Sequence, residues 1–175
     1  MKEYKILITG TMGAGKTTAI GVISDTPPIT TDVTNNDQTH TKKKTTVGMD
    51  FGTVQLDSGD RLRIFGTPGQ ERFDFLWNVL AKHAIGIIIL VDNSRPKPLE
   101  DLDKYLVGFS DKLQKTACVI GIGRTETHSK PSLDDYADHL FMHNQLVPII
   151  PVDVRQRADV LLLIDSLLMQ VEAMD

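Results

Sequence analysis

The chain has little cysteine and no excess of positive charge, and each shortage excludes a class of protein. Cys118 is the only cysteine among 175 residues, so no intrachain disulfide can form, which suits a reducing cytosol and predicts a cytoplasmic protein. Cys118 lies in an apolar run, which favours a core residue over a nucleophile. The formal net charge is −4 and the only long basic run is Lys42-Lys43-Lys44, so we expect no binding to nucleic acid.

Long apolar runs are also missing. No stretch approaches the about 20 residues that a transmembrane helix requires. We expect no signal peptide, because Met1-Lys2-Glu3 leads directly into a strand-like run. We also expect no intrinsic membrane anchor, because the C-terminus lacks a prenylation cysteine and Lys2 excludes the myristoylation start. The composition, 41% hydrophobic and 24% charged, is that of an ordinary globular protein, and the length predicts one domain over residues 1–175.

A glycine-rich loop between a predicted strand and a predicted helix is the clearest motif that is present. Residues 10–17 have the sequence GTMGAGKT, which fits the pattern GxxxxGK[ST]. In such a loop, successive backbone N–H groups surround phosphate oxygens at the positive end of the helix. Lys16 adds a charge for the β- and γ-phosphates, and the Thr17 hydroxyl can ligate Mg²⁺. The alternative is a glycine-rich turn that carries a lysine by chance.

The loop therefore predicts binding of a nucleoside triphosphate with Mg²⁺. Lys16 is also a candidate catalytic residue, since its charge reaches the phosphates. The candidate nucleotide-binding residues of this region are Gly10, Thr11, Met12, Gly13, Ala14, Gly15, Lys16, Thr17 and Thr18.

Alternating apolar and amphipathic segments predict an α/β fold. Strands are expected at residues 4–9, 51–56, 61–65, 85–91, 116–122 and 146–152, and helices at 17–23, 73–84, 98–114, 132–144 and 160–171. The second and third strands flank a turn sequence and should form an antiparallel edge hairpin. The expected architecture is a P-loop NTPase three-layer fold, with a six-stranded, mostly parallel sheet and about five helices. Polar residues 29–46 should form a long loop.

Two further segments resemble the switch regions of Ras-like small GTPases. Residues 66–73, GTPGQERF, follow a predicted strand and resemble switch II, whose usual form is DxxGQ. Residues 45–51, TTVGMDF, resemble the TIGxDF of switch I. The wording of switch II is most similar to the prokaryotic branch that includes MglA and the GTPases of actinobacterial conservon operons. The order and spacing of the motifs are similar to the family over the whole chain.

The resemblance implies a switch that binds GTP or GDP and slowly hydrolyses GTP. Thr46 would ligate Mg²⁺ together with Thr17 and would contact the γ-phosphate. Gly69 would contact the γ-phosphate through its N–H group. Gln70 would be catalytic, because its amide would orient the attacking water. A solvated loop residue and an ordinary strand threonine are the alternatives for Gln70 and Thr46.

The two switch segments imply protein partners. Residues 29–50 and 67–80 would change shape with the nucleotide and present a surface to a partner. The family suggests regulatory proteins, Roadblock-type regulators among them, and downstream effectors. We expect a monomer or a weak dimer. Trp77 follows switch II, where it could be either a core residue or an interface anchor.

Two departures from the family pattern concern the phosphate end of the site. Gly66 stands where switch II usually begins with an aspartate that reaches Mg²⁺ through water. Asp50 or Asp92 could replace that carboxylate. Met12 stands where Ras itself has a glycine, and its bulk should hinder an arginine inserted by a conventional activator, so hydrolysis should be slow and assisted differently.

The third departure concerns recognition of the base. Where the family has NKxD, Gly123 stands for Asn, Arg124 for Lys and Glu126 for Asp. Arg124 could lie over a purine face. Glu126 could accept hydrogen bonds from N1 and N2 of guanine, and adenine offers no donor at N1. A plain polar loop is the alternative. Asp153 and Val154 occupy the place of a further base-contact loop.

Two rival functions remain open. A P-loop small-molecule kinase or ATPase shares the phosphate loop, but the late arginines are only Arg124, Arg155 and Arg157, with no lid-like insertion. A nucleotide-binding module without hydrolysis is kept open by Gly66.

One pair of histidines has the spacing of metal ligands. His139 and His143 are i, i+4 in a predicted helix. No HExxH motif or third ligand accompanies them in the sequence, so we expect no metal there.

Overall fold

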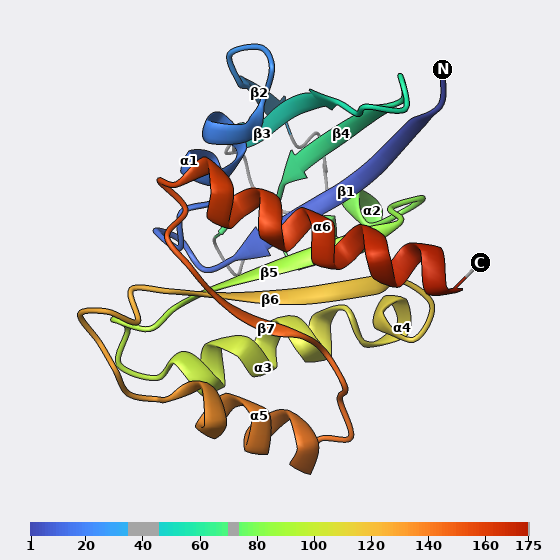
Figure 1. The fold of residues 1–175 in the computed structure, drawn as a ribbon. Helices are drawn as coiled ribbons and strands as arrows, with labels where there is room; N and C mark the ends of the chain where they lie inside the picture. Colours follow the sequence, from blue (N-terminus) through green and yellow to red (C-terminus); the bar gives the residue numbers. More distant parts are fainter. Residues whose placement is uncertain (35–45, 70–73, 175) are drawn as a thin grey trace, which may run out of the picture.

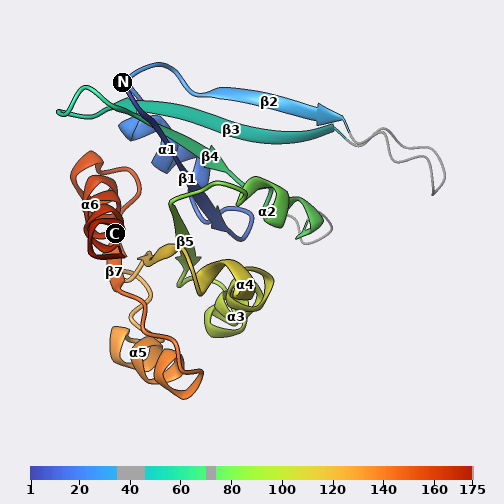
Figure 2. The same cartoon turned by 90° about the vertical axis from the view of Figure 1, so that its right-hand side faces the viewer.

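One central sheet with helices on both faces organises the chain, as Figures 1 and 2 show in a computed structural model of the protein. The structure describes residues 1–34, 46–69 and 74–174. The strands of this part are β1 Glu3–Gly10, β2 Ile29–Thr34, β3 Thr46–Gln55, β4 Arg61–Gly66, β5 Gly86–Asp92, β6 Ala117–Gly123 and β7 Ile149–Val152. Its helices are α1 Lys16–Ile23, α2 Asp74–Leu80, α3 Pro98–Gly108, α4 Ser110–Leu113, α5 Leu133–Met142 and α6 Arg157–Met174.

The sheet confirms the predicted α/β fold. Within the described residues it has seven strands, in the spatial order β2-β3-β4-β1-β5-β6-β7. Neighbouring strands are parallel in the series β4-β1-β5-β6-β7. Strand β3 runs antiparallel to both β2 and β4. The predicted hairpin of β3 and β4 is therefore confirmed. Parallel strands end at one edge of the sheet, which brings the loops after β1, β5, β6 and β7 together.

Two hydrophobic cores, one on each face, fix the layers. Strand β5 is buried along its whole length, because helices cover both of its faces. Ile88 and Leu90 of β5 pack with α1 and α6. Ile87 and Ile89 pack on the other face with α2, α3 and α5. The alternation follows from the two-residue period of a strand, and it explains why the run reads as uniformly apolar.

The expectation of a loop over residues 29–46 is wrong for its first part. Residues Ile29–Thr34 form β2, which pairs with β3 from Ile29 opposite Phe51 to Thr34 opposite Thr46. An edge strand has only one neighbour, so it requires no apolar run, and its threonines suit an extended backbone. This strand raises the count from the predicted six to seven.

The predicted helices are confirmed, with shifted boundaries and with one of them divided in two. The segment expected as one helix over 98–114 is divided into α3 and α4, because α3 ends at Gly108, against which Trp77 packs. A Cβ on Gly108 would lie 2.9 Å from the indole. Trp77 is a core residue, 4% exposed and stacked on Tyr105 and Phe109.

Helix α5 begins with a capping box. The Ser132 side chain accepts a hydrogen bond from the Asp135 N–H, and the Asp135 carboxylate accepts one from the Ser132 N–H. Cys118 is buried in β6, and burial raises the pKa of its thiol to about 12, so it is a core residue, as predicted. No helix of the described residues is both long enough and apolar enough to cross a membrane.

Candidate nucleotide-binding site

The glycine-rich loop joins β1 to α1 at the edge where the parallel strands end. Gly10 and Gly15 have φ angles of 149° and 98°, in the region that favours glycine. A Cβ on Gly10 would collide with the carbonyl oxygen of Leu90, and one on Gly15 would lie 2.6 Å from Val154 Cγ2. The loop therefore passes closely between β5 and the segment after β7, which only glycine permits at these positions.

Lys16 holds a positive charge at the mouth of the loop. Its Nζ donates hydrogen bonds to the carbonyl oxygens of Gly10, at 2.6 Å, and Thr11, at 2.8 Å. Burial lowers the pKa of Lys16 to about 8, although the Asp50 carboxylate acts in the opposite direction. A bound anion would favour the charged form of this ammonium, which burial disfavours. The Thr11 hydroxyl is also buried and has no hydrogen-bond partner among the described residues.

Asp50 supplies a carboxylate beside the position where the family aspartate is missing. The Thr17 hydroxyl donates a hydrogen bond to Asp50 Oδ2. Phe51 of β3 pairs with Phe65 of β4. Asp50 therefore lies opposite Gly66, and a Cβ on Gly66 would lie 3.5 Å from the Asp50 Cβ. Of the two carboxylates considered from the sequence, Asp50 lies beside Thr17 and Gly66, whereas Asp92 pairs with Arg124.

The segment after β4 lies directly on the phosphate loop. A Cβ on Gly69 would lie 2.7 Å from the backbone nitrogen of Met12 and 2.9 Å from Lys16 Nζ. Thr67 anchors the segment, because its hydroxyl lies 2.7 Å from that of Thr9 in β1 and both side chains are buried. Gly69 thus approaches the position where a terminal phosphate would bind, and a larger residue would not fit there.

One cleft of about 860 Å³ joins the phosphate loop to the loops after β6 and β7. Its lining includes Met12, Gly13, Ala14, Gly15, Lys16, Thr17, Thr18, Gly69, Arg124, Glu126, Asp153 and Val154, all of them candidates from the sequence. The structure therefore brings together four segments of the chain: the phosphate loop and the segments after β4, β6 and β7. Gly10 and Thr11 lie under the cleft, where they hold Lys16.

Arg124 connects the base side of the cleft to the phosphate loop. Its guanidinium forms an ion pair with Asp92 at the end of β5 and donates hydrogen bonds to the Gly13 carbonyl oxygen, at 3.3 and 3.4 Å. Burial alone would raise the pKa of Asp92, but hydrogen bonds from Ser94 and Arg124 hold it below its usual value. These contacts use the N–H groups of Arg124 and hold its guanidinium between Asp92 and the phosphate loop.

The two acidic candidates at the far end of the cleft differ in their partners. The Asp153 carboxylate accepts hydrogen bonds from Nε and Nη2 of Arg155, at 2.9 and 2.8 Å, and these lower its pKa to about 2. The Asp153 N–H donates to Asp159 at 2.9 Å. Glu126 is exposed and makes no hydrogen bond or ion pair with the residues that the structure describes. Glu126 is therefore the carboxylate that remains available to a base.

Two candidates are not placed by the structure. Gln70 lies outside the described residues, and so does the side chain of Thr46, whose backbone belongs to β3. Their roles stay predictions. Two residues of the site were not among the candidates from the sequence. Thr67 lies in the segment that resembles switch II, where nothing marked it as an anchor. Arg155 was considered only as a late arginine, although its place two residues after Asp153 was a signal for their pairing.

Curated relatives of the chain are Ras-related proteins. The chain is 32% identical to Ras-related protein Rab-10 of Diplobatis ommata over 106 residues, which are 59% of this chain and 48% of the relative. It is 32% identical to Ras-related protein Rab-12 of Mus musculus over 107 residues, 59% of this chain and 40% of the relative. It is 24% identical to Ras-related protein RABA1h of Arabidopsis thaliana over 123 residues, 69% of this chain and 51% of the relative.

These similarities support an assignment of the chain to the Ras-like superfamily. The matched regions cover between 40% and 51% of these relatives, so the chain spans about half of their length or less. A family described as "Conserved hypothetical ATP binding protein" matches residues 28–114, a region that begins after the phosphate loop. Together the relatives and the family support nucleotide binding by a P-loop protein.

Proposed function

We propose that the protein is a molecular switch that binds GTP and GDP with Mg²⁺, hydrolyses GTP slowly and belongs to the prokaryotic MglA-like or conservon-type branch. One observation carries the proposal: the phosphate loop, Gly69 and Glu126 lie in one cleft. Glu126 supports guanine, because a carboxylate can accept two hydrogen bonds from N1 and N2 of guanine. The similarity to Ras-related proteins supports the same class.

The donor atoms at the phosphate end fit Mg²⁺. Hydroxyl and carboxylate oxygens are its preferred ligands, and it usually keeps several waters. Thr17 and Thr46 would ligate the ion directly, and Asp50, hydrogen-bonded to Thr17, would orient its waters. When bound, the ion neutralises charge that develops on the phosphates. Lys16 and the loop N–H groups would hold the β- and γ-phosphates, and Gln70 would orient the attacking water.

Signalling would pass through the segments at the phosphate end. Residues 29–50 and 67–80 include β2, the whole of α2 and Gly69. Their arrangement would depend on whether a γ-phosphate is present. The partners we propose are regulatory proteins, a Roadblock-type regulator among them, and downstream effectors. We further propose a cytoplasmic protein of one domain, monomeric or weakly dimeric.

An adenine-nucleotide protein is the second candidate, favoured by the matching family description. Calorimetry with GDP, GTP, ADP and ATP, with and without Mg²⁺, separates the two candidates. We expect guanine nucleotides to bind at least about tenfold more tightly, which is about 1.4 kcal/mol. Equal or tighter binding of adenine nucleotides would overturn the guanine assignment and leave a P-loop ATPase or kinase.

The substitution Glu126→Gln tests the base contact itself. It keeps the shape of the side chain but removes the charge that pairs with the two guanine donors. We expect GDP affinity to fall about tenfold, with little change for ADP. Glu172→Gln in α6, outside the cleft lining, is the matched control. An equal loss for both nucleotides would mean that Glu126 does not read the base.

The substitution Arg124→Ala tests the connection between the base side and the phosphate loop. It leaves Asp92 without its cationic partner, so we expect the free energy of unfolding at pH 7 to fall by about 1–3 kcal/mol. The pKa of Asp92 in the folded protein lies below its ordinary value of 3.8. The ionised carboxylate therefore stabilises the fold fully above that ordinary value, and this stabilisation is lost as the pH falls through the pKa of the folded protein.

Urea unfolding at several pH values measures this effect. The difference between the wild type and Arg124→Ala should be full near pH 7 and should narrow below about pH 4. Arg157→Ala serves as the control, because Arg157 donates a hydrogen bond to the Val22 carbonyl and pairs with no carboxylate among the residues that the structure describes. A difference that does not change with pH would show that the Asp92 pair is not its source.

A further inference from the structure

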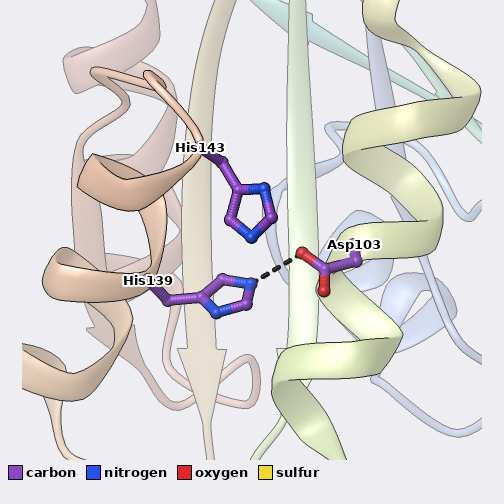
Figure 3. Close-up of side chains that lie close together, drawn as sticks. All are labelled: Asp103, His139 and His143. Atoms are coloured by element: carbon purple, nitrogen blue, oxygen red, sulfur yellow. Dashed lines mark hydrogen bonds and ion pairs between the residues drawn. The ribbon is translucent and has the colours of Figure 1, made fainter.

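A second group of side chains, away from the nucleotide cleft, has the chemistry of a metal site. Asp103 of α3, His139 of α5 and His143, which directly follows α5, point toward one another, as Figure 3 shows. His139 Nε2 lies 2.6 Å from Asp103 Oδ1, and the two imidazole rings have centroids 4.7 Å apart. One ligand atom from each side chain lies within 4.8 Å of the other two. The sequence offers no third candidate beside the two histidines, but the structure places Asp103 next to them.

The fold holds these side chains in place. Tyr136 and Leu140 of α5 are buried, and the Tyr136 hydroxyl donates a hydrogen bond to Asn93 Oδ1 at 2.7 Å. His139 and His143 each follow one of these anchors by three residues, so they lie together on the neighbouring face of the helix. The side chain of His139 is 15% exposed and that of Asp103 is 36% exposed, which leaves one side open to solvent.

We propose that Asp103, His139 and His143 bind a divalent transition-metal ion, Zn²⁺ being the best fit. Two imidazoles with one carboxylate are a common zinc donor set, whereas Mg²⁺ and Ca²⁺ prefer oxygen ligands alone. Zinc at about 2.0–2.2 Å from tetrahedral N and O ligands separates those atoms by roughly 3.4 Å. Small side-chain rotations from the present positions would reach that spacing. Three protein ligands leave a fourth position for water.

The hydrogen bond between Asp103 and His139 offers a simpler explanation, in which the pair only ties α5 to α3. That explanation gives no role to His143, whose ring nevertheless faces the same carboxylate (Figure 3). His143 therefore distinguishes the two explanations. An ion at this position would also lie beside the groove between α2 and α3, because Asp103 lines that groove with Trp77 and Val107.

Zinc calorimetry on the full, untagged, metal-free chain in excess Mg²⁺ tests the proposal. We expect one Zn²⁺ per chain with a Kd of about 10 µM or tighter. His143→Asn keeps the Asp103–His139 hydrogen bond but should weaken zinc binding at least about tenfold, and Asp103→Asn should do the same. His83→Asn is the matched control, since His83 is exposed and has a positive φ that asparagine tolerates.

A second measurement guards against misfolded variants. Circular dichroism and GDP binding should be unchanged in His143→Asn, because neither histidine lines the nucleotide cleft. Zinc should raise the thermal midpoint of the wild type and of His83→Asn, but not that of His143→Asn. No zinc binding to the wild type would overturn the proposal. Binding that His143→Asn and Asp103→Asn leave unchanged would also overturn it, because the ion would then lie elsewhere.

Discussion

Replacing Lys16 with methionine should weaken GTP and GDP binding by about 100-fold or more, which is about 2.7 kcal/mol. The ammonium lies at the mouth of the phosphate loop, held by the carbonyl oxygens of Gly10 and Thr11. Methionine keeps most of the aliphatic volume and removes the charge that the phosphates require. Because burial already disfavours the charged form of Lys16, we expect the nucleotide-free variant to remain folded, with a smaller change in stability than in affinity.

Lys5→Met is the matched control for this experiment. Lys5 also donates to a backbone carbonyl, that of Lys82 at 3.1 Å, and burial also lowers its pKa, with Arg63 contributing. It lies outside the cleft lining, so its variant should bind nucleotides as the wild type does. Calorimetry measures the affinities and urea unfolding measures the stabilities. If Lys16→Met bound GTP as tightly as Lys5→Met, the loop would not be a phosphate site.

The phosphate end of the site could be predicted because its signal is contiguous. Eight successive residues determine the loop, and its flanking strand and helix are recognisable from local periodicity. Gly10 and Gly15 could be identified because both are fixed positions of the motif GxxxxGK[ST]. Gly69 could also be predicted, because it lies after β4 in a segment that is recognisable from the sequence.

The base end could not be predicted to the same degree, because its geometry depends on contacts between distant segments. The sequence suggested that the Arg124 guanidinium could cover a purine. In the structure it is occupied by Asp92 and Gly13, which are 32 and 111 positions away. Asp153 is engaged too, but by Arg155 only two residues away, so a local pattern could suggest that pair. The contacts of Arg124 depend on packing between distant segments, and no local pattern contains that information.

The same reason accounts for two omissions. Strand β2 carries no apolar run, because only one side of its backbone pairs and the tertiary contact with β3 decides its conformation. Asp103 precedes His139 by 36 residues, so spacing along one helix could not reveal it. Choosing between Asp50 and Asp92 required the register of β3 against β4, which places Asp50 opposite Gly66.

That register leads to the second large expected effect, in the variant Asp50→Asn. Asparagine keeps the size of the side chain and an acceptor for the Thr17 hydroxyl, but it removes the carboxylate charge. We expect the factor by which Mg²⁺ increases GTP affinity to fall at least about tenfold, or about 1.4 kcal/mol. The affinity for GTP without Mg²⁺ should not fall, because the carboxylate of the wild type repels the phosphates and the variant lacks it. Asp57→Asn, in the exposed turn of the same hairpin, is the control.

A second substitution can return the carboxylate from the opposite strand. Gly66→Asp in the Asp50→Asn background places a carboxylate on β4, where the family pattern has it, next to the vacated charge. A Cβ at residue 66 would lie 3.1 Å from Ile20 Cδ1, the far end of a flexible side chain, so a small movement makes room. The Mg²⁺ dependence of GTP affinity should recover in the double variant. Recovery would show that the charge, rather than the strand that carries it, is what the site requires; an unchanged Mg²⁺ dependence in Asp50→Asn itself would show that Asp50 has no part in binding the ion.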